Sequence, residues 1–131
     1  MPITAFYASL LTVLFLLLSA RVIAQRREAR VEIGHGESAQ LLRRMRVHAN
    51  FTEYVPMALI LMALAESLKA PSILLHLLGL VLIAARVLHA YGLSQTPHIL
   101  RLRVLGMSLT FTVIGVAAAL CFLLAGVQLI V

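Results

Sequence analysis

Long apolar stretches alternate with short polar segments along the whole chain. Each stretch is long enough for a membrane-spanning helix, which needs about 20 mostly apolar residues. The pattern predicts an all-α fold, a four-helix bundle integral to the membrane, in a single domain over residues 1–131. The four predicted spans are residues 3–24, 47–66, 72–93 and 104–131.

The second stretch carries polar side chains on one helical face. Arg46, Asn50, Glu53 and Tyr54 follow the spacing i, i+4, i+7 and i+8, an arc of about 100° on a helix. Ionisable residues at membrane depth are costly and usually face a bundle interior or a cavity. This face is therefore expected to turn away from lipid. Pro56 should free a backbone carbonyl and bend the same helix.

The third stretch contains Arg86 at a depth similar to that of Glu53. Both lie roughly 10–12 Å from the arginine-rich ends of their helices, at 1.5 Å per residue. We expect these two side chains to pair or to share a polar ligand. His89 follows on the face of Arg86, near the level of Asn50. The sequence therefore predicts a polar pocket that is ringed by arginine and opens to the cytoplasm.

Composition excludes a soluble domain. The chain is 62% hydrophobic and only 12% charged, against roughly 45–50% and about 25% in soluble domains. The same numbers exclude disorder. The net charge of +6 comes from ten arginines and one lysine against five glutamates. Because these charges sit between apolar stretches, anionic lipid and topology explain them better than nucleic acid.

The loops predict an orientation. Residues 25–46 and 94–103 hold eight arginines, whereas the middle loop holds only Lys69. The positive-inside rule places the first and third loops in the cytoplasm and both termini on the opposite side. The N-terminal stretch lacks a basic leader, so it is expected to be an uncleaved span. Gly34-His35-Gly36 is the expected break in the first loop.

Two further features concern cysteine and glycine. The single cysteine, Cys121, allows no internal disulfide, and no His, Cys or Glu set has convincing metal spacing. No metal is therefore expected. In the fourth stretch, Gly106, Gly115 and Gly126 are small residues suited to close helix contact.

The predicted pocket offers guanidinium groups, an amide, a carboxylate and a phenol. This set suits a water-soluble ligand with carboxylates and an ammonium group, and the bilayer can supply a lipophilic co-substrate. Two other functions fit the same residues. One is a small proton-coupled transporter that uses Glu53. The other is a non-catalytic membrane adaptor or lipid-binding scaffold whose working surface is the basic first loop.

The segment Arg46-Val-His48-Ala-Asn50-Phe-Thr-Glu53-Tyr54-Val-Pro56 resembles the signature of the MAPEG family, the membrane-associated proteins in eicosanoid and glutathione metabolism. Residues 86–92, RVLHAYG, extend the resemblance, most closely to short bacterial members. It implies a homotrimer of four-helix subunits in the bacterial inner membrane, with glutathione bound between subunits near the cytoplasmic side. The implied activity is that of a glutathione transferase or peroxidase.

The resemblance also implies roles for individual residues. Arg103 would be catalytic and stabilise the glutathione thiolate, with Arg101 close enough to compete for that role. Family positions that hold glutathione correspond to Arg46, Asn50, Glu53 and Tyr54. His89 stands where the family has a tyrosine, and a second family tyrosine falls at Leu93. Further contacts are possible at Arg86 and Tyr91. The neighbouring subunit would supply Arg26 and His48, and His48 does face about 160° away from Asn50 on a helix.

These features predict that the thiolate attacks a lipophilic electrophile or reduces a lipid hydroperoxide. Thiolate stabilisation and positioning would be the protein's contribution. The expected partners are a second and third copy of the chain, membrane lipid and a lipophilic small molecule, with no nucleic acid. The sequence leaves open the lipophilic co-substrate, and whether the reaction is conjugation, peroxide reduction or isomerisation.

Overall fold

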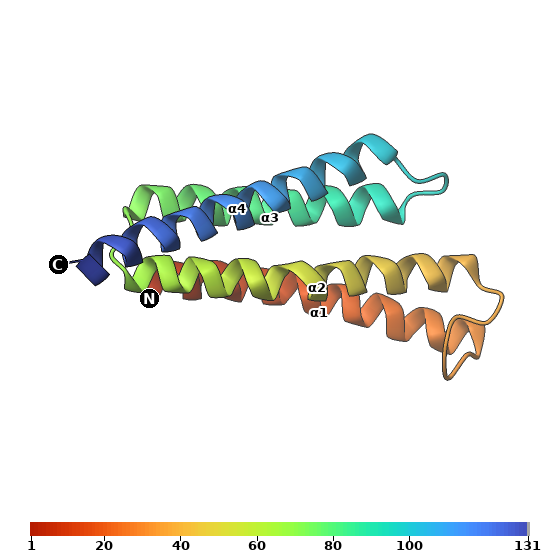
Figure 1. Cartoon of the computed structure of the whole chain (residues 1–131). Helices are drawn as coiled ribbons and strands as arrows, with labels where there is room; N and C mark the ends of the chain where they lie inside the picture. Colours follow the sequence, from red (N-terminus) through yellow and green to blue (C-terminus); the bar gives the residue numbers. More distant parts are fainter. Residues whose placement is uncertain (131) are drawn as a thin grey trace.

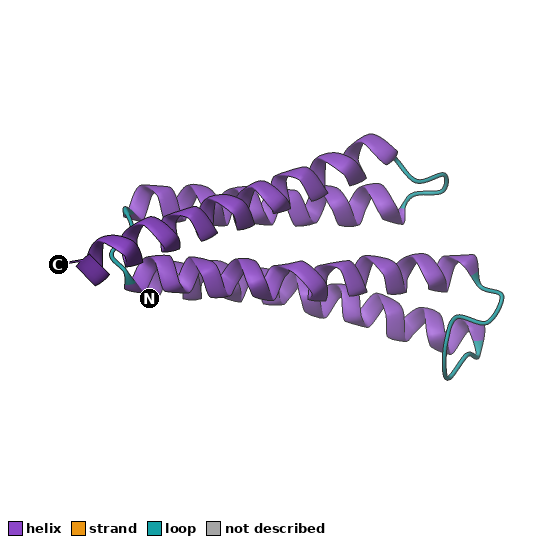
Figure 2. Ribbon diagram, in the orientation of Figure 1, coloured by secondary structure: helices purple, strands orange, loops and turns teal. Residues whose placement is uncertain are grey.

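Four long helices make up the structure, a computed structural model that describes residues 1–130 (Figure 1). They form two antiparallel hairpins, and both chain ends lie at the end of the bundle where the α2–α3 connection runs. Only three short connections lie outside the helices (Figure 2). The helices are α1 (Pro2–Ala29), α2 (Ala39–Ser67), α3 (Ser72–Ser94) and α4 (Leu100–Ile130). This arrangement confirms the predicted four-helix, all-α fold.

The first amides of α1 are capped by a side chain from another helix. Pro2 occupies the first turn, and Met1 gives no side-chain cap. Instead, the Glu66 carboxylate at the end of α2 accepts bonds from the amides of Ile3, at 2.9 Å, and Thr4, at 2.8 Å. These amides have no partner within their own helix, and a carboxylate there also complements the helix dipole. Glu66 thus ties the two helices together.

The loop between α1 and α2 breaks where the sequence predicts. Gly34 and Gly36 have φ angles of 74° and 54°, in the left-handed region that favours glycine. Ser38 then caps α2 by accepting a bond from the Leu41 amide at 3.2 Å. Because of this cap, α2 starts at Ala39, eight residues before the predicted apolar span, and it continues through Pro56 as one helix. Apolar stretches mark only the lipid-level part of a helix.

Glycine sets the closest approach between α3 and α4. A Cβ atom added at Gly106 would lie 2.6 Å from the Ala85 carbonyl oxygen and 2.7 Å from the His89 amide nitrogen. The predicted close contact is therefore confirmed at Gly106. At Gly115 and Gly126 no helix of the same chain approaches, and nothing lies within 4 Å of an added Cβ, so for these two the prediction is not tested within one chain. Those two positions face open space beside α4.

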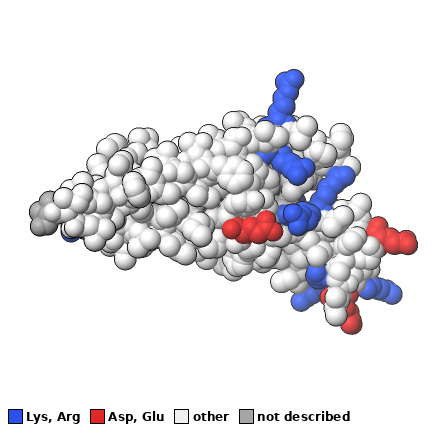
Figure 3. Space-filling model, viewed as in Figure 1, with Lys and Arg blue, Asp and Glu red and all other residues white. Residues whose placement is uncertain are grey.

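The two ends of the bundle differ in charge. In Figure 3, blue and red side chains gather at the end that carries the α1–α2 and α3–α4 loops, while the rest of this face is almost entirely white. All four helices have the length and hydropathy of membrane spans. Nine of the ten arginines lie in residues 21–46 or 101–103, near the charged end. The tenth, Arg86, lies inside a span.

Candidate functional site

Arg86 is buried in the bundle with neutral partners. Its side chain is only 1% exposed. One terminal nitrogen donates to the Asn50 side-chain oxygen at 2.6 Å, and the other lies 3.3 Å from the Thr110 hydroxyl and 3.8 Å from the Met107 sulfur. A buried cation normally needs a nearby anion to offset the loss of hydration. Arg86 therefore brings α2, α3 and α4 together around an uncompensated positive charge.

The predicted pairing of Glu53 with Arg86 is wrong. Asn50 and Thr110 take the Arg86 hydrogen bonds, and Glu53 is exposed on the outer side of α2. Helix geometry explains the error. At 100° per residue, Glu53 lies at one edge of the polar arc and Tyr54 at the other, and α3 and α4 pack against the Tyr54 side. The acidic residue is thus turned away from the cavity that its neighbours form.

A polar cavity of about 340 Å³ lies between α2, α3 and α4. It sits toward the loop end of the bundle, where the two hairpins diverge in Figure 1. Three of the predicted glutathione contacts on α2 line it, together with His89 of α3 and the predicted catalytic residue of α4. Its lining is Arg46, Asn50, Tyr54, His89, Leu93, Arg103 and Met107.

Buried nitrogen atoms without partners lie beside this cavity. His89 is 2% exposed, and its Nδ1 lies 3.2 Å from the main-chain oxygen of Arg103. Within residues 1–130, neither Nε2 of His89 nor Nε of Arg86 has a hydrogen-bond partner. Buried polar atoms are nearly always paired in native proteins. These two atoms therefore indicate a place where a ligand or water completes the structure.

Other predicted site residues lie outside the cavity lining. His48 faces away from Asn50, as helix geometry predicted, and packs on α1: its Nε2 lies 3.0 Å from the Ser19 hydroxyl, and its ring lies on Phe15 with centroids 5.1 Å apart. Arg26 donates to the Gly34 carbonyl at 2.7 Å. Tyr91 and Arg101 are exposed. Within this single chain, these four side chains do not converge with the residues that line the cavity.

Thr110 and Met107 were missed by the sequence reasoning, and Leu93 was noted only as a position where the family has a tyrosine. Met107 and Leu93 line the cavity, and Thr110 binds Arg86. The signal for two of them was present, because Arg103, Met107 and Thr110 follow i, i+4 and i+7 on α4 and share a face. In the sequence, Thr110 is a polar residue on the same face of the apolar helix α4 as Arg103, and this position indicates a role near the site.

A second cavity, of about 380 Å³, adjoins the first. The two share Arg103 and Met107, and the Phe111 ring of the second cavity meets the Tyr54 ring of the first edge-on, with centroids 5.4 Å apart. All six lining residues of the second cavity lie on one face of α4, and five of them are exposed in the single chain, so it is an open, mainly apolar hollow on the outside of that helix. The complete lining is Leu100, Arg103, Val104, Met107, Ser108 and Phe111. A polar and an apolar cavity thus meet at one arginine.

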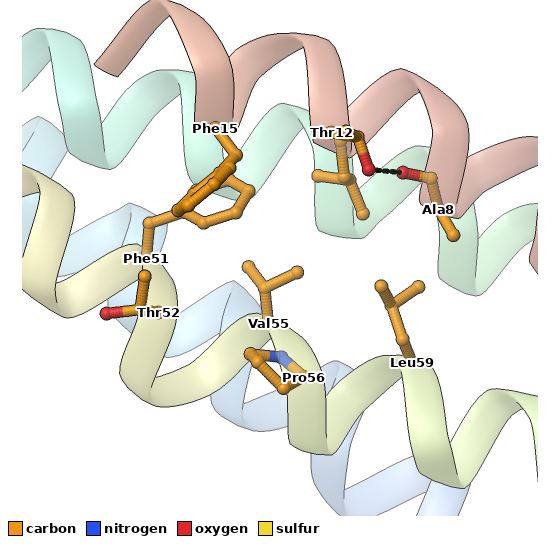
Figure 4. Close-up of a pocket in the computed structure, with 9 residues that line it drawn as sticks. Ala8, Thr12, Phe15, Phe51, Thr52, Val55, Pro56 and Leu59 are labelled. Atoms are coloured by element: carbon orange, nitrogen blue, oxygen red, sulfur yellow. Dashed lines mark hydrogen bonds between the residues drawn. The ribbon is translucent and has the colours of Figure 1, made fainter. Parts of the chain in front are cut away.

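A third cavity, of about 330 Å³, lies between α1 and α2 (Figure 4). Phe15 and Phe51 close one end with ring centroids 6.1 Å apart, and Val55, Pro56 and Leu59 continue the wall. Phe51 lies within 5.9 Å of the Arg86 guanidinium carbon, measured to the ring centroid. The buried aromatic ring therefore separates this apolar cavity from the charged group.

The α3–α4 loop, which leads to Arg103, is held by Arg43 of α2. The Arg43 guanidinium donates to the Gln95 carbonyl at 2.8 Å and also to the Thr96 hydroxyl. The loop amide of Ile99 donates back to the Gly92 carbonyl at 2.8 Å. These bonds fix where α4 begins. Across the described residues 1–130, no group of three or more His, Cys, Asp or Glu side chains is placed to hold a metal ion.

Comparison with known proteins agrees with the resemblance in the motif. The profile of the MAPEG family matches residues 4–123. The inner membrane protein YecN of Escherichia coli K12 is 36% identical over 109 residues, which cover 83% of this chain and 82% of that protein. The protein of the same name from E. coli O6:H1 matches to the same extent. The chain therefore belongs to the MAPEG family and is an integral membrane protein with four membrane-spanning helices.

Proposed function

We propose that the protein is a membrane-bound, glutathione-dependent transferase or peroxidase. The observation that carries this proposal is the meeting of a polar and an apolar cavity at Arg103. Such an arrangement lets a water-soluble thiol and a lipophilic molecule approach the same cation from two sides. Holding two reactants in this way is a large part of many enzymatic rate enhancements.

The charges around the polar cavity favour an anionic ligand. Two arginines, Arg46 and Arg103, line it, and none of its seven lining residues is acidic. Guanidinium groups bind carboxylates through paired hydrogen bonds, and glutathione carries two carboxylates. The amide of Asn50 and the phenol of Tyr54 add neutral polar contacts. A ligand carboxylate would also offset the uncompensated charge of Arg86 behind Asn50.

The thiol of glutathione would be activated electrostatically. A free thiol has a pKa of about 8.5, so only a few per cent is thiolate at neutral pH. A guanidinium in a site of low dielectric constant stabilises the thiolate, and Arg103 is the cation that both cavities share. Both Arg101 and Arg103 are exposed in the single chain, but Arg101 lines neither cavity. This placement supports Arg103 as the activating residue.

The assembled enzyme would be a homotrimer with its sites toward the cytoplasm. Glu53 is exposed at membrane depth, where a bare carboxylate is costly, so a neighbouring subunit that covers it would remove that cost. Glu53 could then bind the ammonium group of glutathione at the subunit boundary. Arg26 and His48, which lie outside the cavity of their own chain, would complete the site of a neighbour.

The position of Glu53 disfavours a proton-coupled transporter. Such a transporter would need the acidic residue inside the substrate cavity, where its protonation could alternate with binding of a cation. In this chain the cavity is lined by arginine, and Glu53 lies outside it. Arginines would repel a cationic substrate.

The proposal is tested with purified protein in detergent, by calorimetric binding of glutathione and steady-state conjugation of an aryl halide. Wild-type protein should bind glutathione and turn over. Arg103→Ala should lower turnover by about 10²–10³-fold, as loss of a transition-state charge contact does. Arg101→Ala is the matched control and should retain nearly full turnover. Absence of glutathione binding by wild-type protein would refute the proposed function.

A further inference from the structure

The hydrogen bond at Nδ1 of His89 fixes which ring nitrogen carries the proton. Nδ1 lies 3.2 Å from the main-chain oxygen of Arg103. A carbonyl oxygen can only accept, so Nδ1 must donate. In a neutral imidazole the other nitrogen is then an acceptor. Nε2 of His89 therefore carries a lone pair and no hydrogen.

That lone pair has no donor in the chain. Nε2 is buried and unpartnered within residues 1–130, although the His89 ring lines the polar cavity. An unmade hydrogen bond at a buried nitrogen is costly, so a bound molecule with a donor hydrogen would repair the defect. The chain thus holds an oriented, unpartnered proton acceptor just behind the wall of its proposed ligand site, and a small shift of the ring or its neighbours would bring Nε2 into contact with a ligand.

The groups around His89 are cationic or neutral. From α2 the cavity receives Arg46, Asn50 and Tyr54, and from α4 it receives Arg103 and Met107. Arg86 lies one turn earlier on α3. No carboxylate is among the lining residues, so an imidazolium formed here would need an anion from the ligand. A thiolate supplies that anion at the moment the proton is transferred.

We propose that Nε2 of His89 accepts the proton of the bound glutathione thiol. This proposal rests on the proposed glutathione-dependent function. The S–H bond breaks heterolytically: its electron pair stays on sulfur, and its proton forms a new N–H bond at Nε2. Arg103 then neighbours the thiolate. When the thiolate displaces halide from an aryl halide, the carbon–sulfur bond forms, the halide leaves with its electron pair, and the imidazolium releases the proton to water.

This assignment gives the two neighbouring groups different tasks. Arg103 would stabilise the negative sulfur and so favour the thiolate at equilibrium. His89 would provide the route by which the proton leaves and so set the rate of thiolate formation. The main-chain oxygen of Arg103 accepts the hydrogen bond from Nδ1 and so orients the His89 ring. The base of an activated nucleophile is commonly oriented by a third group in this way.

Rapid mixing of glutathione with detergent-solubilised protein tests the proposal. Thiolate absorbance and a pH indicator follow deprotonation, and calorimetry follows binding. For His89→Phe we expect thiolate formation to slow by about 10²–10⁴-fold, the usual contribution of a positioned base. Its glutathione dissociation constant should rise by only about fivefold, the loss of one neutral hydrogen bond. His98→Phe, in the exposed α3–α4 loop, is the matched control and should behave as wild type.

A second variant separates proton transfer from a structural role. His89→Ala leaves space for a free imidazole, so added imidazole should restore much of the rate of thiolate formation. A ring that only packs or positions would show no such rescue. Unchanged thiolate formation in His89→Phe would overturn the proposal, as would loss of glutathione binding in His89→Ala. Wild-type protein that binds glutathione without deprotonating it would refute the proton transfer alone, whereas failure to bind refutes the proposed function as well.

Discussion

The two ends of the bundle differ in the hydrogen-bond partners of their polar groups. At the end that holds the chain termini, the Glu66 carboxylate caps two amides of α1, and the Tyr7 hydroxyl lies 3.1 Å from Nδ1 of His76. At the loop end, Arg86 and His89 each keep a buried nitrogen without a partner in residues 1–130, and at the terminal end the Thr4 hydroxyl is likewise unpartnered. The charged group at the first end, Glu66, nevertheless closes the bundle through its bonds to main-chain amides. The two nitrogens at the second end are left available for a ligand.

This difference suggests that one end of the protein contributes mainly to stability and the other mainly to ligand binding. Charged groups that satisfy backbone amides stabilise the fold directly. A buried cation without an anion is costly until a ligand compensates it. Substitutions at the terminal end should therefore lower stability and spare binding, and substitutions of cavity side chains should do the reverse.

The largest expected effect is at Gly106, where fold and cavity depend on the same backbone contact. Gly106→Ala places a Cβ atom against the backbone of α3, so the helices must separate. We expect the free energy of unfolding to fall by about 1–3 kcal/mol, together with loss of glutathione binding. Gly115→Ala is the control, because open space surrounds it. Equal stability of the two variants by denaturant titration in micelles would contradict the structure.

Arg86→Met tests the difference between the two ends most directly. It removes a buried charge while keeping an unbranched apolar side chain. We expect glutathione affinity to fall by about tenfold or more, the loss of one charge contact. Stability should be unchanged or raised, because no buried anion is left behind. A large drop in unfolding free energy would instead show that Arg86 has a structural role like that of Glu66.

Glu66→Ala tests the same difference at the end that holds the chain termini. Loss of the carboxylate leaves the amides of Ile3 and Thr4 uncapped, which should cost about 0.5–2 kcal/mol in unfolding free energy. Glu66→Gln keeps an acceptor and should cost less. Glutathione binding should be unchanged in both. Glu53→Gln serves as the stability control in monomeric preparations, since that carboxylate is exposed.

The smallest effect is expected for Tyr7→Phe. The variant keeps the ring that packs over Gly79 and loses only the hydrogen bond to His76. Because His76 is exposed, the loss should be at the low end of about 0.5–1.5 kcal/mol. Tyr91→Phe, on an exposed position, should show no change in unfolding. A loss in Tyr7→Phe larger than that in Glu66→Ala would reverse the expected order.

Most of the fold follows from the sequence because apolar runs of membrane length leave little choice of structure. The break at Gly34-His35-Gly36 and the family signature were also recognisable. The start of α2 was not, since half of its first eight residues are polar, three of them arginines, and the helix begins at the Ser38 cap rather than where the long apolar run begins. Periodicity places a residue on a face, but it does not say which neighbouring helix covers that face.

The site shows the same limit. Arg46, Asn50, Tyr54, His89 and Arg103 do line one cavity, as their spacing and the family motif suggested. The predicted pairing of Glu53 with Arg86 was wrong because a shift of one residue moves a side chain by 100° around the helix. Thr110 was missed because it becomes a partner of Arg86 only when α3 and α4 are packed together. Partner choice depends on helix packing.

The contact at Gly106 has a consequence for how the site can change over evolutionary time. The main chains of α3 and α4 are in contact there. The spacing between His89 of α3 and the turn of α4 that carries Arg103 is therefore independent of the surrounding apolar side chains. Leucine, valine and isoleucine around it could therefore interchange without moving the two helices apart. The reacting groups would keep their separation through such drift.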